Sequence, residues 1–222
     1  MVSLPGWYEK MGLFIFIRAI IWAVLSTLVM KLSKNMIHRN YGGEHHVKNI
    51  AVGIAFFQIS FFIGIVAAIK SESMIIWYVL MVSYLALLAA AQFDIELYII
   101  PNMIPCFLIA CKLLMMVYLF FVHENVKDEV IGSVLGCVVC LMILTIAGFF
   151  SHGGVGKGDV KLLSALGFAC GLYPTIVTLI AALICCTVIA LLLIGLKKVS
   201  WKDHLPFGPF IFLGYVIMIC YI

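Results

Sequence analysis

The chain has 222 residues, of which 65% are hydrophobic and only 11% are charged, and its formal net charge is +4. Soluble domains have an apolar fraction of about 45–50%, so this composition excludes an ordinary soluble protein. The small positive charge is spread over several loops, which argues against a nucleic-acid-binding surface. The chain is therefore predicted to be an all-α, polytopic membrane protein.

The first five membrane segments follow from hydrophobic runs long enough to cross a bilayer. A spanning helix needs about 20 mostly apolar residues. The runs that meet this requirement are Met11–Met30, Ile50–Ile69, Met74–Phe93, Met103–Val122 and Val130–Phe150.

The next hydrophobic run, Leu162–Leu196, contains no charged residue. As one helix it would extend about 52 Å, well beyond the hydrocarbon core of about 30 Å. A break is expected near Gly171, Tyr173 and Pro174, since the residue before a proline resists the helical conformation. The total is eight segments, completed by a short sixth (Leu162–Leu172), a seventh (Pro174–Leu196) and an eighth (Pro206–Ile222).

The distribution of basic residues predicts the orientation of these segments. One set of alternating loops holds nine cations, namely Lys31, Lys34, Arg39, Lys48, Lys157, Lys161, Lys197, Lys198 and Lys202. The other set holds three, namely Lys10, Lys70 and Lys127. The positive-inside rule places the first set in the cytoplasm, so both termini are expected outside.

Metal and redox chemistry are not expected. The eight cysteines all lie in apolar runs, and the CxxC spacing of Cys137 and Cys140 is interpreted as small apolar filling, with redox or metal chemistry as the alternative. The first loop holds His38, His45 and His46, but adjacent histidines rarely face one ion, so a solvated basic loop is favoured over a metal site.

Two aspartates stand out because this topology puts both at the cytoplasmic membrane boundary. Asp94 ends the third span, and Asp159 follows the fifth, 65 residues later. Two neighbouring carboxyl groups share a proton, which suits aspartic proteolysis: one group takes a proton from water while the other polarises the peptide carbonyl. The alternatives are that Asp159 N-caps a helix beginning at Val160, and that Asp94 is an ordinary interfacial acid.

Three motifs resemble one known family. "GVGKGDVK" looks like the GxGD signature of membrane aspartic proteases, "FDIELYIIPN" looks like the other motif of the type IV prepilin peptidases, and "PFGPF" is similar to the segment that opens their last helix. The resemblance implies cleavage of the leader peptide of prepilins or pseudopilins at the cytoplasmic face of the cytoplasmic (inner) membrane. It implies a prepilin or pseudopilin partner with a leader and an apolar helix, a lipid environment, and no nucleic acid.

The resemblance also implies site residues. Asp94 and Asp159 would be the catalytic pair, Pro101 and Asn102 would shape one loop, and Gly156 and Gly158 the other. The glycines would allow close backbone approach to substrate and positive φ. Lys161 matches a lysine often found after the second aspartate, where it could bias ionisation of the pair or hold an acidic substrate group; as an alternative it is a basic interfacial anchor.

One departure from the larger bacterial members concerns the N-terminal region. Residues 1–49 are expected to form one transmembrane helix and a short basic loop without cysteines, and residues 50–222 the peptidase-like membrane domain. Zinc, any other cofactor and N-methyltransferase activity are therefore not expected. The chain looks like a reduced, peptidase-only member of the tight-adherence or archaeal-like type.

Two other functions remain open from the sequence alone. A small ion- or proton-coupled transporter could use Asp94, Lys112 and Asp159 as a relay, with Lys112 either facing a wet cavity, paired with an acid or snorkelling to the interface. A non-catalytic scaffold for pilus assembly is the third possibility.

Overall fold

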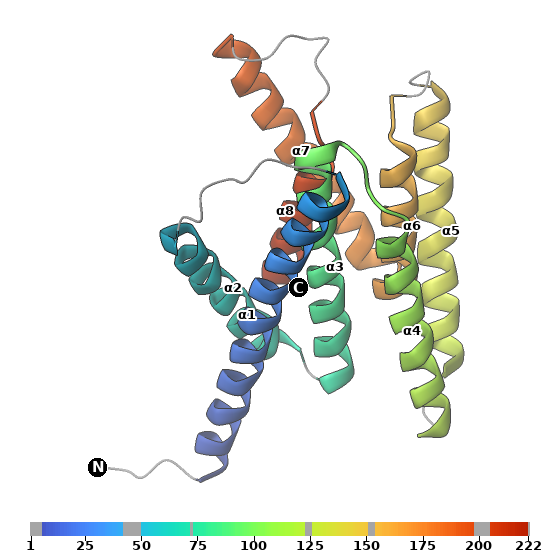
Figure 1. Cartoon of the computed structure of the whole chain (residues 1–222). Helices are drawn as coiled ribbons and strands as arrows, with labels where there is room; N and C mark the ends of the chain where they lie inside the picture. Colours follow the sequence, from blue (N-terminus) through green and yellow to red (C-terminus); the bar gives the residue numbers. More distant parts are fainter. Residues whose placement is uncertain are drawn as a thin grey trace.

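The computed structural model describes residues 6–41, 50–71, 73–122, 126–150, 154–197 and 205–221. This part of the chain is all-α (Figure 1). The helices are α1 (Gly6–Tyr41), α2 (Ile50–Lys70), α3 (Met74–Leu97), α4 (Met103–Phe121), α5 (Val126–Phe150), α6 (Lys157–Cys170), α7 (Leu172–Gly195) and α8 (Gly208–Tyr221).

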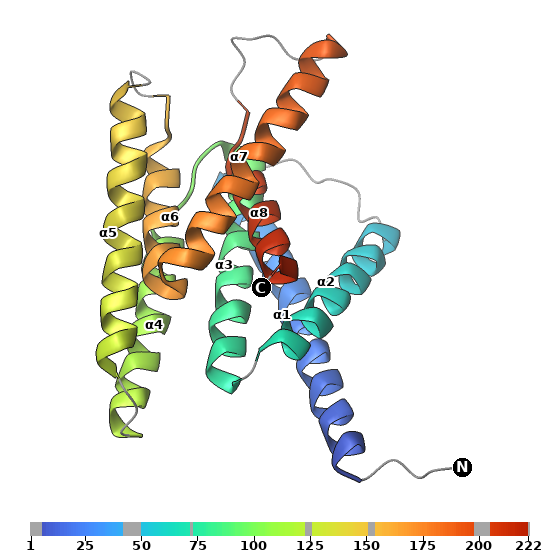
Figure 2. The same ribbon diagram turned by 180° about the vertical axis from the view of Figure 1, so that it is seen from behind.

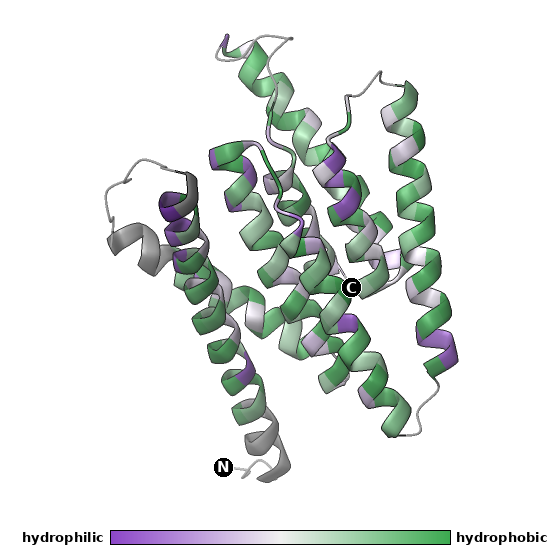
Figure 3. Cartoon of the chain, turned by 45° about the vertical axis from the view of Figure 1, so that its right-hand side comes forward, coloured by the Kyte–Doolittle hydropathy of each residue, from purple (hydrophilic) through white to green (hydrophobic). Residues whose placement is uncertain are grey.

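Each of the eight predicted segments corresponds to one helix, and five of them are long and apolar enough to cross a membrane. Among the described residues these are Gly12–Arg39, Met74–Leu97, Met103–Phe121, Val126–Phe150 and Leu172–Gly195, with shorter apolar helices at Phe56–Lys70 and Gly208–Tyr221. The exterior agrees with this, since the helices are hydrophobic over most of their length (Figure 3) and many large apolar side chains are exposed. The chain is a multi-pass membrane protein.

The helix α1 is longer than the predicted span Met11–Met30. It has 36 residues, which corresponds to about 54 Å. The polar stretch after Met30 contains good helix formers and no glycine or proline before Gly42, so nothing in the sequence ends the helix at the edge of the apolar run.

The predicted break in the long apolar run lies at Gly171. This residue has φ 84 and separates α6 from α7, a conformation that glycine adopts without strain. Pro174 does not itself break the helix, because it falls in the first turn of α7, where a missing amide is tolerated.

The helices form two groups joined by α7. In Figures 1 and 2, α4, α5 and α6 lie on one side, α1 and α2 on the other, and α3 and α8 in the centre, while α7 crosses from α6 toward α8. Successive helices alternate in direction. As a result, the C-terminal end of α3 and the N-terminal ends of α6 and α8 lie at the same end of the bundle.

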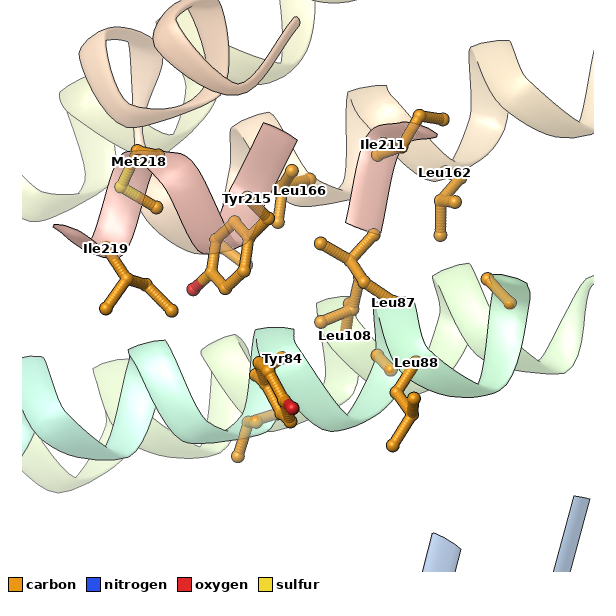
Figure 4. Close-up of a cluster of buried hydrophobic side chains, with 14 of the residues drawn as sticks. Tyr84, Leu87, Leu88, Leu108, Leu162, Leu166, Ile211, Tyr215, Met218 and Ile219 are labelled. Atoms are coloured by element: carbon orange, nitrogen blue, oxygen red, sulfur yellow. The ribbon is translucent and has the colours of Figure 1, made fainter. Parts of the chain in front are cut away.

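The core lies where α3 and α8 face each other, with α4 and α6 behind (Figure 4). Tyr84 of α3 is almost fully buried; its ring centroid is 5.1 Å from those of both Trp22 and Phe212, and its hydroxyl is 3.2 Å from the hydroxyl of Ser60. One tyrosine thus connects α1, α2, α3 and α8, and this packing holds α3 against α8.

Close helix crossings need glycine on α5 and α6. A Cβ at Gly136 would lie 2.2 Å from the carbonyl oxygen of Gly167, and a Cβ at Gly167 would lie 2.4 Å from that of Gly136. The Gly132–Gly136 pair resembles a GxxxG packing motif, but a Cβ at Gly132 would meet nothing within 4 Å. Only the second glycine of the motif is therefore required by the crossing.

Candidate active site

Asp94 lies in the last turn of α3, buried and facing the start of α8. Its side chain is 7% exposed, and its Oδ2 accepts a hydrogen bond of 2.6 Å from the backbone N–H of Gly208. The backbone of Phe207 also interacts with this carboxylate. The helix ends just beyond, at Tyr98, which has the left-handed conformation and donates its N–H to the carbonyl of Asp94.

Asp159 is the third residue of α6, at the same end of the bundle. Burial raises the pKa of Asp159 to about 7, and the negative charge of Asp94 contributes to the increase. Within the described part of the chain, Oδ1 of Asp159 is buried without a hydrogen-bond partner. The two aspartates are thus close enough to act on each other's charge.

Asp159 is not the N-cap of its helix, so that alternative is wrong. The helix begins at Lys157, and the residue at the cap position is Gly156, which has extended backbone geometry. That alternative placed the first helical residue at Val160, directly after Asp159. The helix in fact begins three residues earlier, at Lys157.

The two glycines of this loop are needed for clearance. A Cβ at Gly156 would lie 2.6 Å from Oδ2 of Asp159, and a Cβ at Gly158 would lie 3.1 Å from Cβ of Ile100. The expectation of positive φ is wrong for Gly156 and Gly158, neither of which adopts it. Glycine at position 156 leaves room for the Asp159 carboxylate, and glycine at position 158 lets α6 pack closely against Ile100, which follows α3.

Pro101 and Asn102 lie in the connection between α3 and α4. The carbonyl of Pro101 accepts a hydrogen bond from the N–H of Ile104, in the first turn of α4, and Asn102 is the N-cap residue of that helix. Oδ1 of Asn102 accepts a hydrogen bond of 3.0 Å from Nζ of Lys161, which is exposed on α6. Lys161 therefore joins the two predicted loops.

Lys112 is separate from this group. Its side chain is 5% exposed and its Nζ lies 2.8 Å from Oε2 of Glu129, on α5. Both residues line a cavity of about 240 Å³ whose walls include Met115 and Cys170, whereas neither Asp94 nor Asp159 lines it. Of the possibilities considered for Lys112, the structure has it paired with an acid, at the border of a cavity.

The site contains one residue that the sequence reasoning missed. Gly208 contributes only its backbone N–H, and a Cβ there would lie 3.0 Å from Cβ and Oδ2 of Asp94. A backbone donor leaves no side chain to recognise. The available signal was the motif "PFGPF", which was noted for its place in the sequence and not for a contact.

The remaining metal candidates lie outside the described residues. His45 and His46 fall in a segment that the structure does not describe. Among the described residues, no group of three or more histidine, cysteine, aspartate or glutamate side chains is placed to hold a metal ion.

Comparison with known proteins gives one family and one relative. The model of the type IV leader peptidase family matches residues 81–191, half of the chain, and this region includes Asp94 and Asp159. A protein of Bacillus subtilis (strain 168) named prepilin leader peptidase/N-methyltransferase is 29% identical over 144 residues, which cover 61% of this chain and 52% of that protein.

The chain thus spans about half the length of the curated relative that it matches. No solved structure matches it. The family match, over the half of the chain that carries both aspartates, shows that the chain belongs to the type IV leader peptidase family.

Proposed function

We propose that the chain is a membrane aspartic endopeptidase that removes the leader peptide of type IV prepilins or pseudopilins, with Asp94 and Asp159 as its catalytic residues. The observation that carries the proposal is that α3 and α6 bring two carboxyl groups to the same end of the bundle, where Asp94 is buried and Oδ1 of Asp159 is buried as well. Structural aspartates are usually neutralised by a cation or fully hydrogen-bonded, whereas Oδ1 of Asp159 is buried without a protein donor in the described part.

The chemistry needs one carboxylate and one carboxylic acid. The carboxylate takes a proton from water, the hydroxide oxygen adds to the scissile carbonyl carbon, and the acid donates its proton to the carbonyl oxygen. The tetrahedral intermediate then collapses: the protonated base gives its proton to the amide nitrogen, the C–N bond breaks, and the acid recovers its proton. No net proton is consumed, and the products are a free carboxyl terminus and a free amine.

The loops around the pair have roles in this proposal. Pro101, Asn102, Gly156 and Gly158 shape the surface over which the leader junction unwinds, and Lys161 connects the two loops through Asn102. The substrate's apolar helix would dock among the membrane helices of the 50–222 domain. Residues 1–49 provide the first membrane helix and its basic loop. The proposal is limited to a reduced, peptidase-only form of the family and includes no methyl transfer.

The proposed location is the cytoplasmic (inner) membrane. All eight helices form membrane segments, with the short α6 reaching across, both termini outside and the aspartates at the cytoplasmic face. The position of Gly171 supports a crossing by α6, because it approaches the carbonyl of Gly132 near the beginning of α5, away from the aspartate end.

The proposal is tested with the purified protein and a prepilin that carries its leader and apolar helix. Asp94→Asn and Asp159→Asn should each abolish cleavage, read as a mass shift of the substrate, because each removes an ionisable group. Glu96→Gln is the matched control: Glu96 is exposed and only two residues from Asp94, and this variant should cleave like the parent. Cleavage by either asparagine variant would remove the assignment.

No contact among the described residues favours the transporter alternative. Lys112 forms its ion pair with Glu129, so it does not connect the two aspartates. Uptake of protons or ions by proteoliposomes that depended on Lys112 would support that alternative over the peptidase.

A further inference from the structure

The two aspartates are not equivalent, because Asp94 faces the beginning of another helix, whereas Asp159 lies in the first turn of its own. Asp94 faces the first residue of α8, and its Oδ2 accepts a hydrogen bond of 2.6 Å from the N–H of Gly208; the backbone of Phe207 also interacts with this carboxylate. Asp159 has no comparable donor at its buried Oδ1 within the described part of the chain.

The sequence of this segment leaves few other amides for the carboxylate. Pro206 and Pro209 flank the pair Phe207–Gly208, and proline has no N–H. The first four amides of a helix lack partners within it; here the N–H of Phe210 already donates to the carbonyl of Phe207. Gly208 therefore supplies the amide at this end of α8 that binds Asp94.

We propose that the Gly208 amide holds the negative charge of the pair on Asp94, so that Asp94 is the base that takes the proton from water and Asp159 is the acid that protonates the peptide carbonyl. The inference rests on the proposed peptidase function. Gly208 acts as a positioning residue, since its amide acts through Asp94 and its missing side chain leaves room for that carboxylate.

Helix dipoles oppose this assignment, but they are weaker. Asp94 lies at the C-terminal end of α3, which disfavours a negative charge, and Asp159 lies in the first turn of α6, which favours one. Such dipole effects act over the length of a helix turn and are individually small. A hydrogen bond made directly to a charged group is stronger, so the Gly208 amide decides the location of the charge.

The other charged groups around the pair do not reverse the assignment. The charged group that acts on Asp159 is Asp94 itself. From the neighbouring elements, Lys161 of α6 donates to Asn102 at the start of α4, Lys157 is exposed on the first turn of α6, and Glu96 is exposed on the last turn of α3.

The most specific test removes the hydrogen of the Gly208 amide. Replacing the Gly208 amide by an ester, through incorporation of glycolic acid at this position, deletes the N–H and adds no atom that could clash. We expect kcat on a prepilin to fall about tenfold to a hundredfold, as for loss of one hydrogen bond to a charge, with KM little changed. The acid limb of the kcat–pH profile should move to higher pH, because the charged form of Asp94 has lost a donor.

Two further variants separate positioning from folding. Gly208→Ala should give the same shift of the acid limb, because its Cβ would push the carboxylate away from the amide. Gly195→Ala is the matched control, since a Cβ at Gly195 meets nothing within 4 Å, and its pH profile should equal that of the parent. An ester variant whose acid limb stays in place would overturn the inference, even if kcat fell.

A readout without substrate distinguishes this inference from the proposed function. The chain has four aspartates, Asp94, Asp128, Asp159 and Asp203, so ¹³C-carboxyl labelling with Asn variants for assignment can report each one. At about pH 6 we expect an ionised Asp94 and a protonated Asp159 in the parent. In the ester variant we expect the protonated fraction of Asp94 to rise and that of Asp159 to fall. The reverse order would refute the inference whether or not prepilin is cleaved, while failure of the parent to cleave would refute the peptidase proposal alone.

Discussion

Asp159 combines a burial that favours its neutral form with a place beside a second carboxyl group. Asp159 and Asp94 were both predicted from the sequence as the catalytic pair, because an acid at a membrane boundary next to glycines or an "IPN" motif is a recognisable pattern. The Gly208 amide could not be identified in the same way. The N–H and the carboxylate are 114 residues apart in the sequence. Their contact depends on how α3 and α8 pack, and no single residue type in the sequence indicates that packing.

Replacing Asp159 by asparagine should raise the stability of the protein at neutral and alkaline pH. The pKa of Asp159 is about 7 in the folded protein and ordinarily 3.8, so the native state binds more protons between these values and its stability falls as pH rises through this range. Asparagine does not titrate. The free energy of unfolding of Asp159→Asn should therefore exceed that of the parent by an amount that grows from about pH 4 to about pH 7 and then levels off at roughly 1–3 kcal/mol. Thermal unfolding in detergent at several pH values measures it.

The matched control is Asp128→Asn, which alters an exposed aspartate in the first turn of α5. There the carboxylate is favourably placed relative to the helix dipole, so this variant should gain no stability at high pH. If Asp159→Asn gave the same stability difference at acid and alkaline pH, the raised pKa of Asp159 would be contradicted.

At the scale of helices, the apolar runs predicted the elements well because membrane helices must be both long and hydrophobic. Their ends were predicted less well. The polar continuation of α1 to Tyr41 and the start of α6 at Lys157 lie outside the apolar runs, where hydropathy carries no information. The Gly132–Gly136 motif predicted close helix packing by α5. Which of the two glycines faces the partner helix depends on the rotation of α5 about its own axis, which the motif does not give.

Gly167→Ala should disturb the crossing and, through α6, the catalytic site. The new Cβ would lie within 2.4 Å of a backbone oxygen that cannot move alone, so α6 must shift, at a cost of about 1–3 kcal/mol. Because Asp159 is carried on the same helix, activity should fall together with the unfolding temperature. Differential scanning fluorimetry and prepilin cleavage measure the two effects.

Gly132→Ala tests the same reasoning on the glycine that has open space around it. This variant should be neutral or gain up to about 1 kcal/mol from the higher helix propensity of alanine. Equal destabilisation by both variants would mean that the crossing does not depend on Gly136 and Gly167.

At the scale of the molecule, the alternation of spans predicted that two distant aspartates return to one end of the bundle. The order of the helices in space could not be predicted in the same way. Nothing in the apolar runs indicates that α3 and α8 form the centre, because side chains facing lipid and side chains facing another helix are equally hydrophobic. That arrangement depends on specific contacts, such as those of Tyr84 with Trp22 and Phe212.

The proposed orientation predicts the side from which each loop is accessible. In a background with all eight cysteines replaced by alanine, Lys34→Cys and Lys157→Cys should react with a membrane-impermeant maleimide only in inverted vesicles. Lys127→Cys, between α4 and α5, should react only in intact spheroplasts. Labelling of Lys157→Cys and Lys127→Cys from the same side would contradict the topology.

The contact between Gly208 and Asp94 also has a consequence for biosynthesis. Because α8 follows α3, α6 and α7 in the chain, a nascent chain that has entered the membrane as far as α7 already carries both carboxyl groups but not the amide that one of them binds. On the proposed function, the site would therefore become competent only after α8 has been translated and packed against α3. A growing chain would be unable to hydrolyse neighbouring peptides before that point.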